Sequence, residues 1–150
     1  MQRQDISSFI QAVEPASALV GIDYGQKRIG VAVSDLGRMI ASPLSIVSSL
    51  DELDCLLQGR KIGGFIVGLP IQMNGQEGPQ AQLTRTWTKK LQKKYNLPIM
   101  FWDERLTSAA ADRFLIGQMD ISRNKQKRLR DQIAAGLILQ SFLDSLALYK

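Results

Sequence analysis

The sequence from Ala18 to Asp35, ALVGIDYGQKRIGVAVSD, most constrains the fold, because an aspartate ends an apolar strand and a glycine turn follows it. The residues before Asp23 are apolar, and strands of this kind usually lie in the middle of a sheet that is covered on both faces. Gly25 supplies the backbone freedom for a reversal, and apolar residues alternate with small ones in the returning segment 29–33. The segment therefore predicts a hairpin that displays Asp23 at the rim of a sheet.

The length and composition of the chain suit one soluble domain. It has 150 residues, of which 45% are hydrophobic, which is enough for a core of its own. No apolar run reaches the length of a membrane span, and residues 1–17 are too polar for a signal peptide. We therefore expect a soluble, cytoplasmic protein.

The chain contains no histidine and a single cysteine, which excludes several kinds of active site. Ser-His-Asp and Cys-His nucleophile systems, histidine general acid–base catalysis and zinc sites with histidine ligands are all unavailable. Carboxylates, lysines or a bound metal ion must therefore do any chemistry. The net charge of +5 indicates a polyanionic partner, although soluble basic proteins without one share this balance.

The hydrophobic pattern predicts three antiparallel strands followed by alternating helices and strands. The short spacing before the third strand allows only an antiparallel meander. A mixed five-stranded α/β sheet flanked by helices follows, as in RNase H-like folds. The expected elements after the first hairpin are a strand at 38–44, a helix at 50–58, a strand at 64–69, a mobile loop at 70–79, a helix at 80–95, a strand at 97–102, a helix at 107–116, a basic linker at 122–130 and a final helix from 131.

The final helix presents an acid on the face that we expect to pack against the sheet. Asp131 shares this face with Ala134, Ala135, Ile138 and Phe142 at helical spacing. The two alanines allow a close approach, so Asp131 would lie near the strand ends. An acid that merely complements the helix dipole is the alternative interpretation.

Three acids from separate elements could then converge at one end of the sheet. They are Asp23, an acid at the end of the last strand, either Asp103 or Glu104, and Asp131 on the final helix. Crowded carboxylates repel one another unless cations neutralise them. Oxygen ligands without histidine or cysteine favour Mg²⁺ or Mn²⁺, so these acids predict a divalent-metal site.

Four segments, taken in order, resemble the RuvX/YqgF family of pre-16S rRNA nucleases, also called Holliday junction resolvase-like proteins. They are GIDYGQKRIGVAVSD, IVGLP with its NG-containing loop, FWDERLTSAAA and DQIAAGLILQSFLD, and they lie between residues 19 and 144. The resemblance implies an RNase H-like fold and a divalent-metal nuclease that matures the 5′ end of the small-subunit rRNA precursor. We accordingly expect an N-terminal extension at 1–17 and a single nuclease domain at 18–150.

The resemblance also implies roles for the acids. Asp23 would be the central metal ligand, Glu104 the second and Asp131 the third, with Asp103 as a further possible ligand. RNase H-like sites usually take the second acid from the fourth strand, but GLP at 68–70 offers none. Adjacent strands lie about 4.8 Å apart, and the longer glutamate side chain spans part of the extra distance. Two ions would then support hydrolysis of a phosphodiester to 5′-phosphate and 3′-hydroxyl ends.

Basic side chains near the expected site are candidates for phosphate contacts, although solvated surface charge is the alternative for each one alone. The run just before Asp131 is the strongest group, because it would deliver a polyanion directly to the metal site. The candidates are Lys27, Arg28, Arg105, Arg123, Lys125, Lys127, Arg128 and Arg130.

Other functions remain open from the sequence. The chain could cleave branched DNA as a Holliday junction resolvase, or act as a non-catalytic RNA-binding factor in ribosome assembly. DYGQKRIG also resembles the phosphate-binding hairpin of actin-like ATPases, but 150 residues supply only one of their two lobes. The choice between precursor rRNA and branched DNA, and between monomer and dimer, is not encoded in these motifs.

Overall fold

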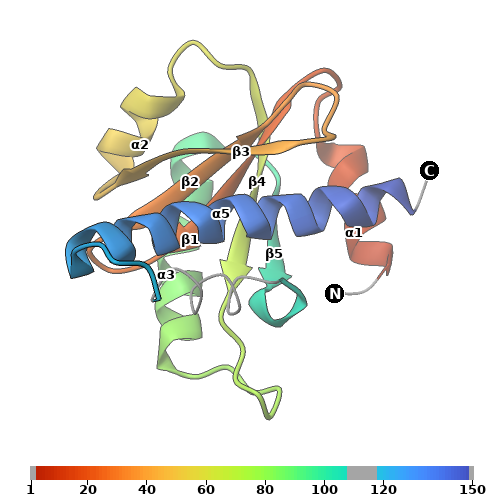
Figure 1. Ribbon diagram of the computed structural model, residues 1–150. Helices are drawn as coiled ribbons and strands as arrows, with labels where there is room; N and C mark the ends of the chain where they lie inside the picture. The colour runs from red at the N-terminus through yellow and green to blue at the C-terminus, as the bar shows by residue number, and fades with distance from the viewer. Residues whose placement is uncertain (1–2, 108–117, 149–150) are drawn as a thin grey trace.

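The computed structural model describes the backbone of residues 3–107 and 118–148, and the side chains of these residues except 3–5, 127–128 and 130–132. Its fold is a mixed five-stranded sheet flanked by helices, in the strand order β3-β2-β1-β4-β5 (Figure 1). The elements are α1 (Arg3–Ala12), β1 (Ala18–Tyr24), β2 (Ile29–Ser34), β3 (Ala41–Val47), α2 (Leu50–Leu57), β4 (Ile62–Leu69), α3 (Pro79–Tyr95), β5 (Ile99–Asp103), the 3₁₀ helix η1 (Glu104–Leu106) and α5 (Arg123–Ala147).

The first three strands form the expected antiparallel meander, and β4 and β5 add to it in parallel with β1. Asp23 pairs with Gly30 across the first hairpin, and Ile22 pairs with Val67 of β4. Leu69 of β4 pairs in turn with the last residue of β5. The carboxyl ends of β1, β4 and β5 therefore meet at one edge of the sheet, which we call the active edge.

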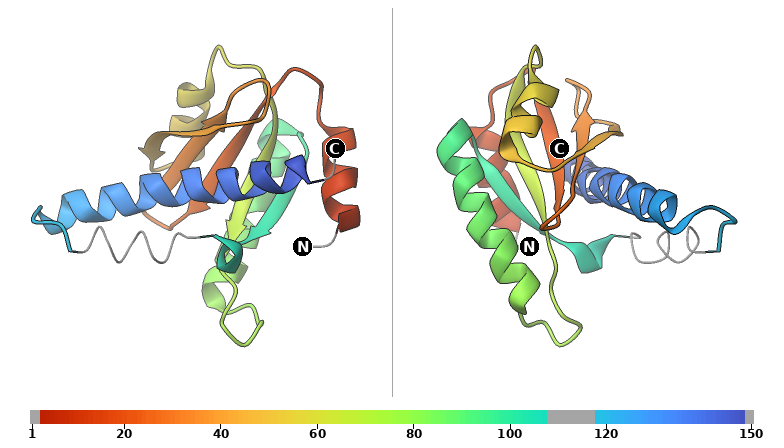
Figure 2. Two further views of the ribbon diagram at one scale, coloured as in Figure 1. Left: turned by 45° about the vertical axis from the view of Figure 1, so that its right-hand side comes forward. Right: turned by 90° about the vertical axis from the view of Figure 1, so that its left-hand side faces the viewer.

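Helices cover both faces of the sheet (Figure 2). One hydrophobic cluster joins α1 and α5 to alternate residues of the strands, including Leu19 and Ile66. The other joins α2 and α3 to the intervening residues, including Val20 and Phe65. The central strands are buried on both faces, as their apolar sequences predict. We call the face covered by α1 and α5 the α5 face.

Helix α5 lies very close to β1 because a glycine faces it. An ideal Cβ on Gly21 would be 2.7 Å from Leu139 Cβ and 2.9 Å from the carbonyl oxygen of Ala135. The predicted packing face of this helix is confirmed for Ala134, Ala135, Ile138 and Phe142, which are all buried, while the side chain of Asp131 lies outside the described ones. The N-terminal half of α5 is thereby directed over the carboxyl end of β1.

Helix α1 lies within the segment that we expected to be an N-terminal extension, and its apolar side chains enter the core. Ile6, Phe9 and Val13 are buried in the same cluster as α5. The rings of Phe9 and Trp102 both contact Phe142 edge to face, at centroid distances of 5.6 and 5.4 Å. The residues of α1 therefore contribute to the same core as the sheet and α5.

Two expectations about element boundaries were wrong. The third strand begins at Ala41 because the preceding residues form a turn, in which Asp35 Oδ1 accepts hydrogen bonds from the backbone N–H groups of Met39 and Ile40. The basic segment 122–130 is not a linker, because α5 begins at Arg123 and the Ser122 hydroxyl caps it. The helix expected at 107–116 falls almost entirely outside the described residues.

One residue of the predicted buried stripe on α3 also differs. Trp87 and Leu91 are buried as expected, but Leu83 is 38% exposed.

Among the helices that the structure describes, none has the length and apolar character needed to cross a membrane.

Candidate active site

Asp23 lies at the active edge, near the end of β1. Side chains alternate between the faces of a strand, so Asp23 lies on the same face as Leu19 and Gly21. Leu19 belongs to the cluster formed with α1 and α5, and Gly21 faces Leu139 of α5. Asp23 is therefore on the α5 face. Its side chain is half-buried and interacts with at least one other residue.

Glu104 follows β5 and its carboxylate lies over the neighbouring strand β4. An ideal Cβ on Gly68 would be 2.9 Å from Glu104 Oε1 and 3.2 Å from its Cγ. The same Cβ would be 2.5 Å from Cδ1 of Ile138, which places this contact on the α5 face. The absence of a side chain at Gly68 is what allows Glu104 to occupy this position.

The strand register brings Glu104 near Asp23. Ile22 pairs with Val67, so the next residue of β1, Asp23, lies beside Gly68. The Glu104 carboxylate over Gly68 is thus about one strand spacing, roughly 5 Å, from β1. Two acids that are separated by a whole strand in the sheet therefore approach one another on the same face.

Asp103 lies on the opposite face and is held by an arginine. Met100 and Trp102 of β5 belong to the α5 face, so Asp103 at the end of the strand faces the other way. Arg105 Nη2 donates to Asp103 Oδ2 at 2.7 Å, and its backbone N–H donates to Oδ1 at 2.9 Å. Burial alone would raise the pKa of Asp103, but these hydrogen bonds outweigh it and lower the pKa below 3.8. Of the two acids, the geometry favours Glu104 as a partner for Asp23.

For Asp131, the third predicted acid, the structure describes only the position of the backbone. Asp131 lies in α5 one helical turn before Ala135, whose carbonyl oxygen contacts the Gly21 position. Because α5 begins at Arg123, Asp131 is not in the first turn as we expected. Its side chain is outside the described part of the protein. Among the described side chains there is no group of three metal-ligating residues, so the three-acid site stays a prediction.

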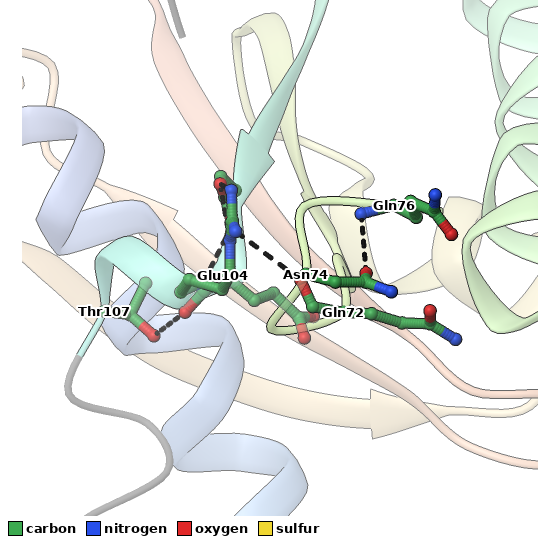
Figure 3. A network of polar contacts seen from close by, with 7 residues as sticks. Gln72, Asn74, Gln76, Glu104 and Thr107 are labelled. Atoms are coloured by element: carbon green, nitrogen blue, oxygen red, sulfur yellow. Dashed lines mark hydrogen bonds and ion pairs between the residues drawn. The ribbon is translucent and has the colours of Figure 1, made fainter. Parts of the chain in front are cut away.

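The segment 71–77 forms a hairpin at the active edge, within the segment 70–79 where the sequence predicted a loop without regular structure. Ile71 and Glu77 form a β-bridge, and the backbone N–H of Gln72 donates to the carbonyl oxygen of Gln76 at 2.9 Å. Figure 3 shows this hairpin beside Glu104. Arg105 Nη1 donates to the carbonyl oxygen of Gln72 at 3.5 Å, which links the hairpin to the end of β5.

The basic candidates fall into three groups. Lys27 is exposed in the first hairpin turn, and beside it Arg28 is half-buried, with a buried Nη1 that has no hydrogen-bond partner among the described residues. Arg105 is engaged with Asp103 and Gln72 and serves as a structural link. On α5, the side chains of Arg123 and Lys125 are exposed. The side chains of Lys127, Arg128 and Arg130 lie outside the described ones.

A model of the family described as "RuvX: Holliday junction resolvase" matches residues 17–145. The chain belongs to the RuvX family. It is 47% identical over 148 residues to a protein of Rhodobacter capsulatus, with 95% of this chain and 92% of that protein covered. A relative from Rhodospirillum rubrum is 38% identical, with 94% and 91% covered. Both are named "Putative pre-16S rRNA nuclease". These matches support the nuclease function that the sequence predicts.

Solved structures establish the fold of this RuvX-family chain as RNase H-like. RuvC of Thermus thermophilus, in complex with a Holliday junction substrate, matches with a TM-score of 0.53 and 13% identity. The match covers 87% of this chain and 96% of RuvC. RuvC in a second structure matches with a TM-score of 0.50 and 15% identity. At such low identity the likeness shows the fold alone.

Two features of this RuvX-family site were not predicted from the sequence. The first is the gap at Gly68, for which a signal existed, since a glycine at the end of a buried strand leaves room for a neighbouring side chain. The second is the hairpin conformation of residues 71–77. Its signal was the Asn-Gly pair at 74–75 between Ile71 and Glu77, a common hairpin turn.

Proposed function

We propose that this chain is a divalent-metal-dependent nuclease that processes the 5′ end of the small-subunit (16S) rRNA precursor. The observation that carries the proposal is the approach of Glu104 to Asp23 across Gly68. The names of the relatives, "Putative pre-16S rRNA nuclease", support the choice of precursor rRNA. This function would place the protein in the cytoplasm, as expected from its sequence.

The acids at the active edge suit a hard cation. Asp23 and Glu104 bring carboxylate oxygens to the same face, and the chain has no histidine that would favour a transition metal. With Asp131 as the third ligand, they would hold Mg²⁺ or Mn²⁺, and two ions when substrate is bound. The cations would supply the Lewis acidity that activates water and stabilises the leaving oxygen.

Basic side chains would hold the nucleic acid backbone beside these acids. Arg28 follows the turn after Asp23, and its buried Nη1 lacks a hydrogen-bond partner in the described residues. Because Nη1 is inaccessible, a substrate phosphate would contact the exposed part of the half-buried Arg28 side chain. Lys27, Arg123 and Lys125 are exposed and would add electrostatic attraction. In this arrangement Arg28 orients the phosphate while the other cations increase affinity.

A second candidate substrate is branched DNA. The description of the matching family model, Holliday junction resolvase, favours it. Backbone contacts and metal chemistry serve both polymers, so the site itself does not separate them. A non-catalytic role in ribosome assembly would use the same basic surface without cleavage.

The test is to incubate the purified protein with a 16S rRNA precursor and with a four-way DNA junction, each with Mg²⁺ or Mn²⁺. We expect cleavage at the 5′ end of the precursor, loss of cleavage in Asp23→Asn, and retained RNA binding. Asp144→Asn is the control, because Asp144 is exposed on the C-terminal part of α5. Cleavage of the junction alone would select the second candidate. Binding without cleavage of either would contradict nuclease activity.

A further inference from the structure

The hairpin 71–77 projects from the active edge without covering the core. Residues 72–77 are exposed, and Met73 at the tip is 93% exposed. Figures 1 and 2 show the segment between β4 and α3 extending beyond the end of the sheet. An apolar side chain in this position contributes nothing to folding and is available for a partner.

The shape of the hairpin is fixed by its own residues. The backbone N–H of Gly75 donates to the carbonyl oxygen of Gln72 at 2.8 Å, and that of Gln76 donates to Asn74 Oδ1 at 2.9 Å. Gly75 has a φ of 84°, a conformation that glycine adopts without strain. Met73 is therefore held on a defined turn.

Both legs of the hairpin are attached to the body of the protein. On one side, Arg105 joins Gln72 to the end of β5. On the other, Arg85 of α3 makes two hydrogen bonds to the Glu77 carboxylate, at 2.6 and 2.7 Å, and lies 4.7 Å from the centre of the Phe101 ring. The tip is consequently fixed relative to Glu104, which immediately precedes Arg105.

The chemistry of the tip suits nucleobases. Residues 71–76 carry no charge, and the side chains of Gln72, Asn74 and Gln76 offer amide donors and acceptors around Met73. Amides of this kind pair with base edges, and apolar side chains such as methionine insert between bases and unstack them. The exposed cations Lys27, Arg123 and Lys125 lie outside the hairpin, where they can hold the backbone.

We propose that the hairpin 71–77 is a base-contacting wedge, in which Met73 inserts between nucleobases next to the phosphate that is cleaved. This inference rests on the proposed nuclease function and deepens it, because it names how the substrate is positioned. The wedge would open the strand at the active edge and select unpaired or easily unstacked nucleotides.

The test measures binding and base unstacking without cleavage. The probes are a single-stranded RNA and a four-way DNA junction, each with one 2-aminopurine, whose fluorescence rises when it is unstacked. Both are titrated with protein in EDTA. We expect wild-type protein to raise the fluorescence, and Met73→Ala to abolish the rise and weaken binding on the order of fivefold. Met73→Phe should retain both effects.

Met39→Ala is the matched control, since Met39 is also exposed, at 61%, but lies in the β2–β3 turn. It should bind and unstack the probes as wild type does. Equal fluorescence and affinity in wild type and Met73→Ala would overturn the wedge, as would a wild-type protein that unstacks neither probe. If Met73-dependent unstacking is present but wild type cleaves nothing with Mg²⁺ or Mn²⁺, the proposed nuclease function fails, while the insertion of Met73 between nucleobases stands.

Discussion

The carboxylate of Glu104 lies against Gly68, so close that an ideal Cβ on this glycine would be 2.9 Å from Glu104 Oε1. Glu104 comes from the end of β5, and Gly68 belongs to the strand between β5 and β1. Because Gly68 has no side chain, the carboxylate of Glu104 can lie over β4 and so come near Asp23. The proposed site would therefore depend on this glycine as well as on the acids.

Replacing Gly68 by alanine should displace Glu104 and reduce cleavage. The new methyl group would also collide with Ile138 Cδ1, at 2.5 Å. We expect a loss of about 1–3 kcal/mol in the free energy of unfolding, from overpacking, and a roughly 10- to 100-fold fall in cleavage rate. Urea denaturation and a cleavage assay with Mg²⁺ measure the two effects.

The two effects can be separated with a second substitution. Ile138→Val removes the Cδ1 atom, so the double variant Gly68→Ala/Ile138→Val should recover stability while cleavage stays low. Ile138→Val alone provides the reference. Full recovery of cleavage in the double variant would show that Gly68 acts through packing alone and that the position of Glu104 is unimportant.

Replacing Arg105 by alanine should loosen the hairpin 71–77. The substitution removes the hydrogen bond to the Gln72 carbonyl oxygen and the contacts with Asp103. We expect faster amide hydrogen exchange at Gln72 and Gly75. Arg38→Ala is the control, because Arg38 contacts Glu14 and Ser17 rather than the hairpin. Unchanged exchange in Arg105→Ala would mean that the hairpin is rigid without this link.

The carboxylate of Glu77 should titrate at a lower pH than usual. Hydrogen bonds from Arg85 hold its pKa below the ordinary 4.5. Because the folded pKa is lowered, ionised Glu77 stabilises the fold above about pH 4.5, and this contribution is lost as the pH falls through the folded pKa. Carbon NMR of the carboxyl group should give a midpoint below 4.5, which returns toward that value in Arg85→Gln. A wild-type midpoint at or above 4.5 would contradict the ion pair.

Helix α1 should be required for stability, although it lies before residues 17–145, which the family model matches. Phe9 is buried and contacts the ring of Phe142. We expect Phe9→Ala to lower the free energy of unfolding by about 3–5 kcal/mol, as measured by urea denaturation. Leu148→Ala, at a side chain that is 79% exposed, should change it by less than about 0.5 kcal/mol. Comparable effects of the two variants would show that α1 is only an appendage.

The sequence predicted the sheet well because its strands are strongly apolar and its first hairpin is short. The pattern around Gly25 and the buried strand that ends at Leu69 both correspond to observed elements. The helix expected at 50–58 is observed at Leu50–Leu57, and the Ser49 hydroxyl caps it by accepting a hydrogen bond from the backbone N–H of Glu52. Local sequence was sufficient in these cases, since burial and turn chemistry point to the same structure.

The differences arise where long-range contacts decide the structure. The polar segment 71–77 has no apolar periodicity, and it contacts Arg105, which is 33 residues away from Gln72 in sequence. Helix α1 is stabilised by Phe142, near the other end of the chain. The position of Glu104 depends on a glycine in a different strand. None of these partners is visible from local patterns.

The central claim is that Asp23, Glu104 and Asp131 hold a divalent cation together. The most direct measurement is the affinity for Mn²⁺ by electron paramagnetic resonance, in wild type and in Asp23→Asn, Glu104→Gln, Asp131→Asn and the control Asp144→Asn. We predict that each of the first three variants weakens Mn²⁺ binding at least about tenfold while the control binds as wild type does. Unchanged Mn²⁺ affinity in the three acid variants would contradict the proposed site.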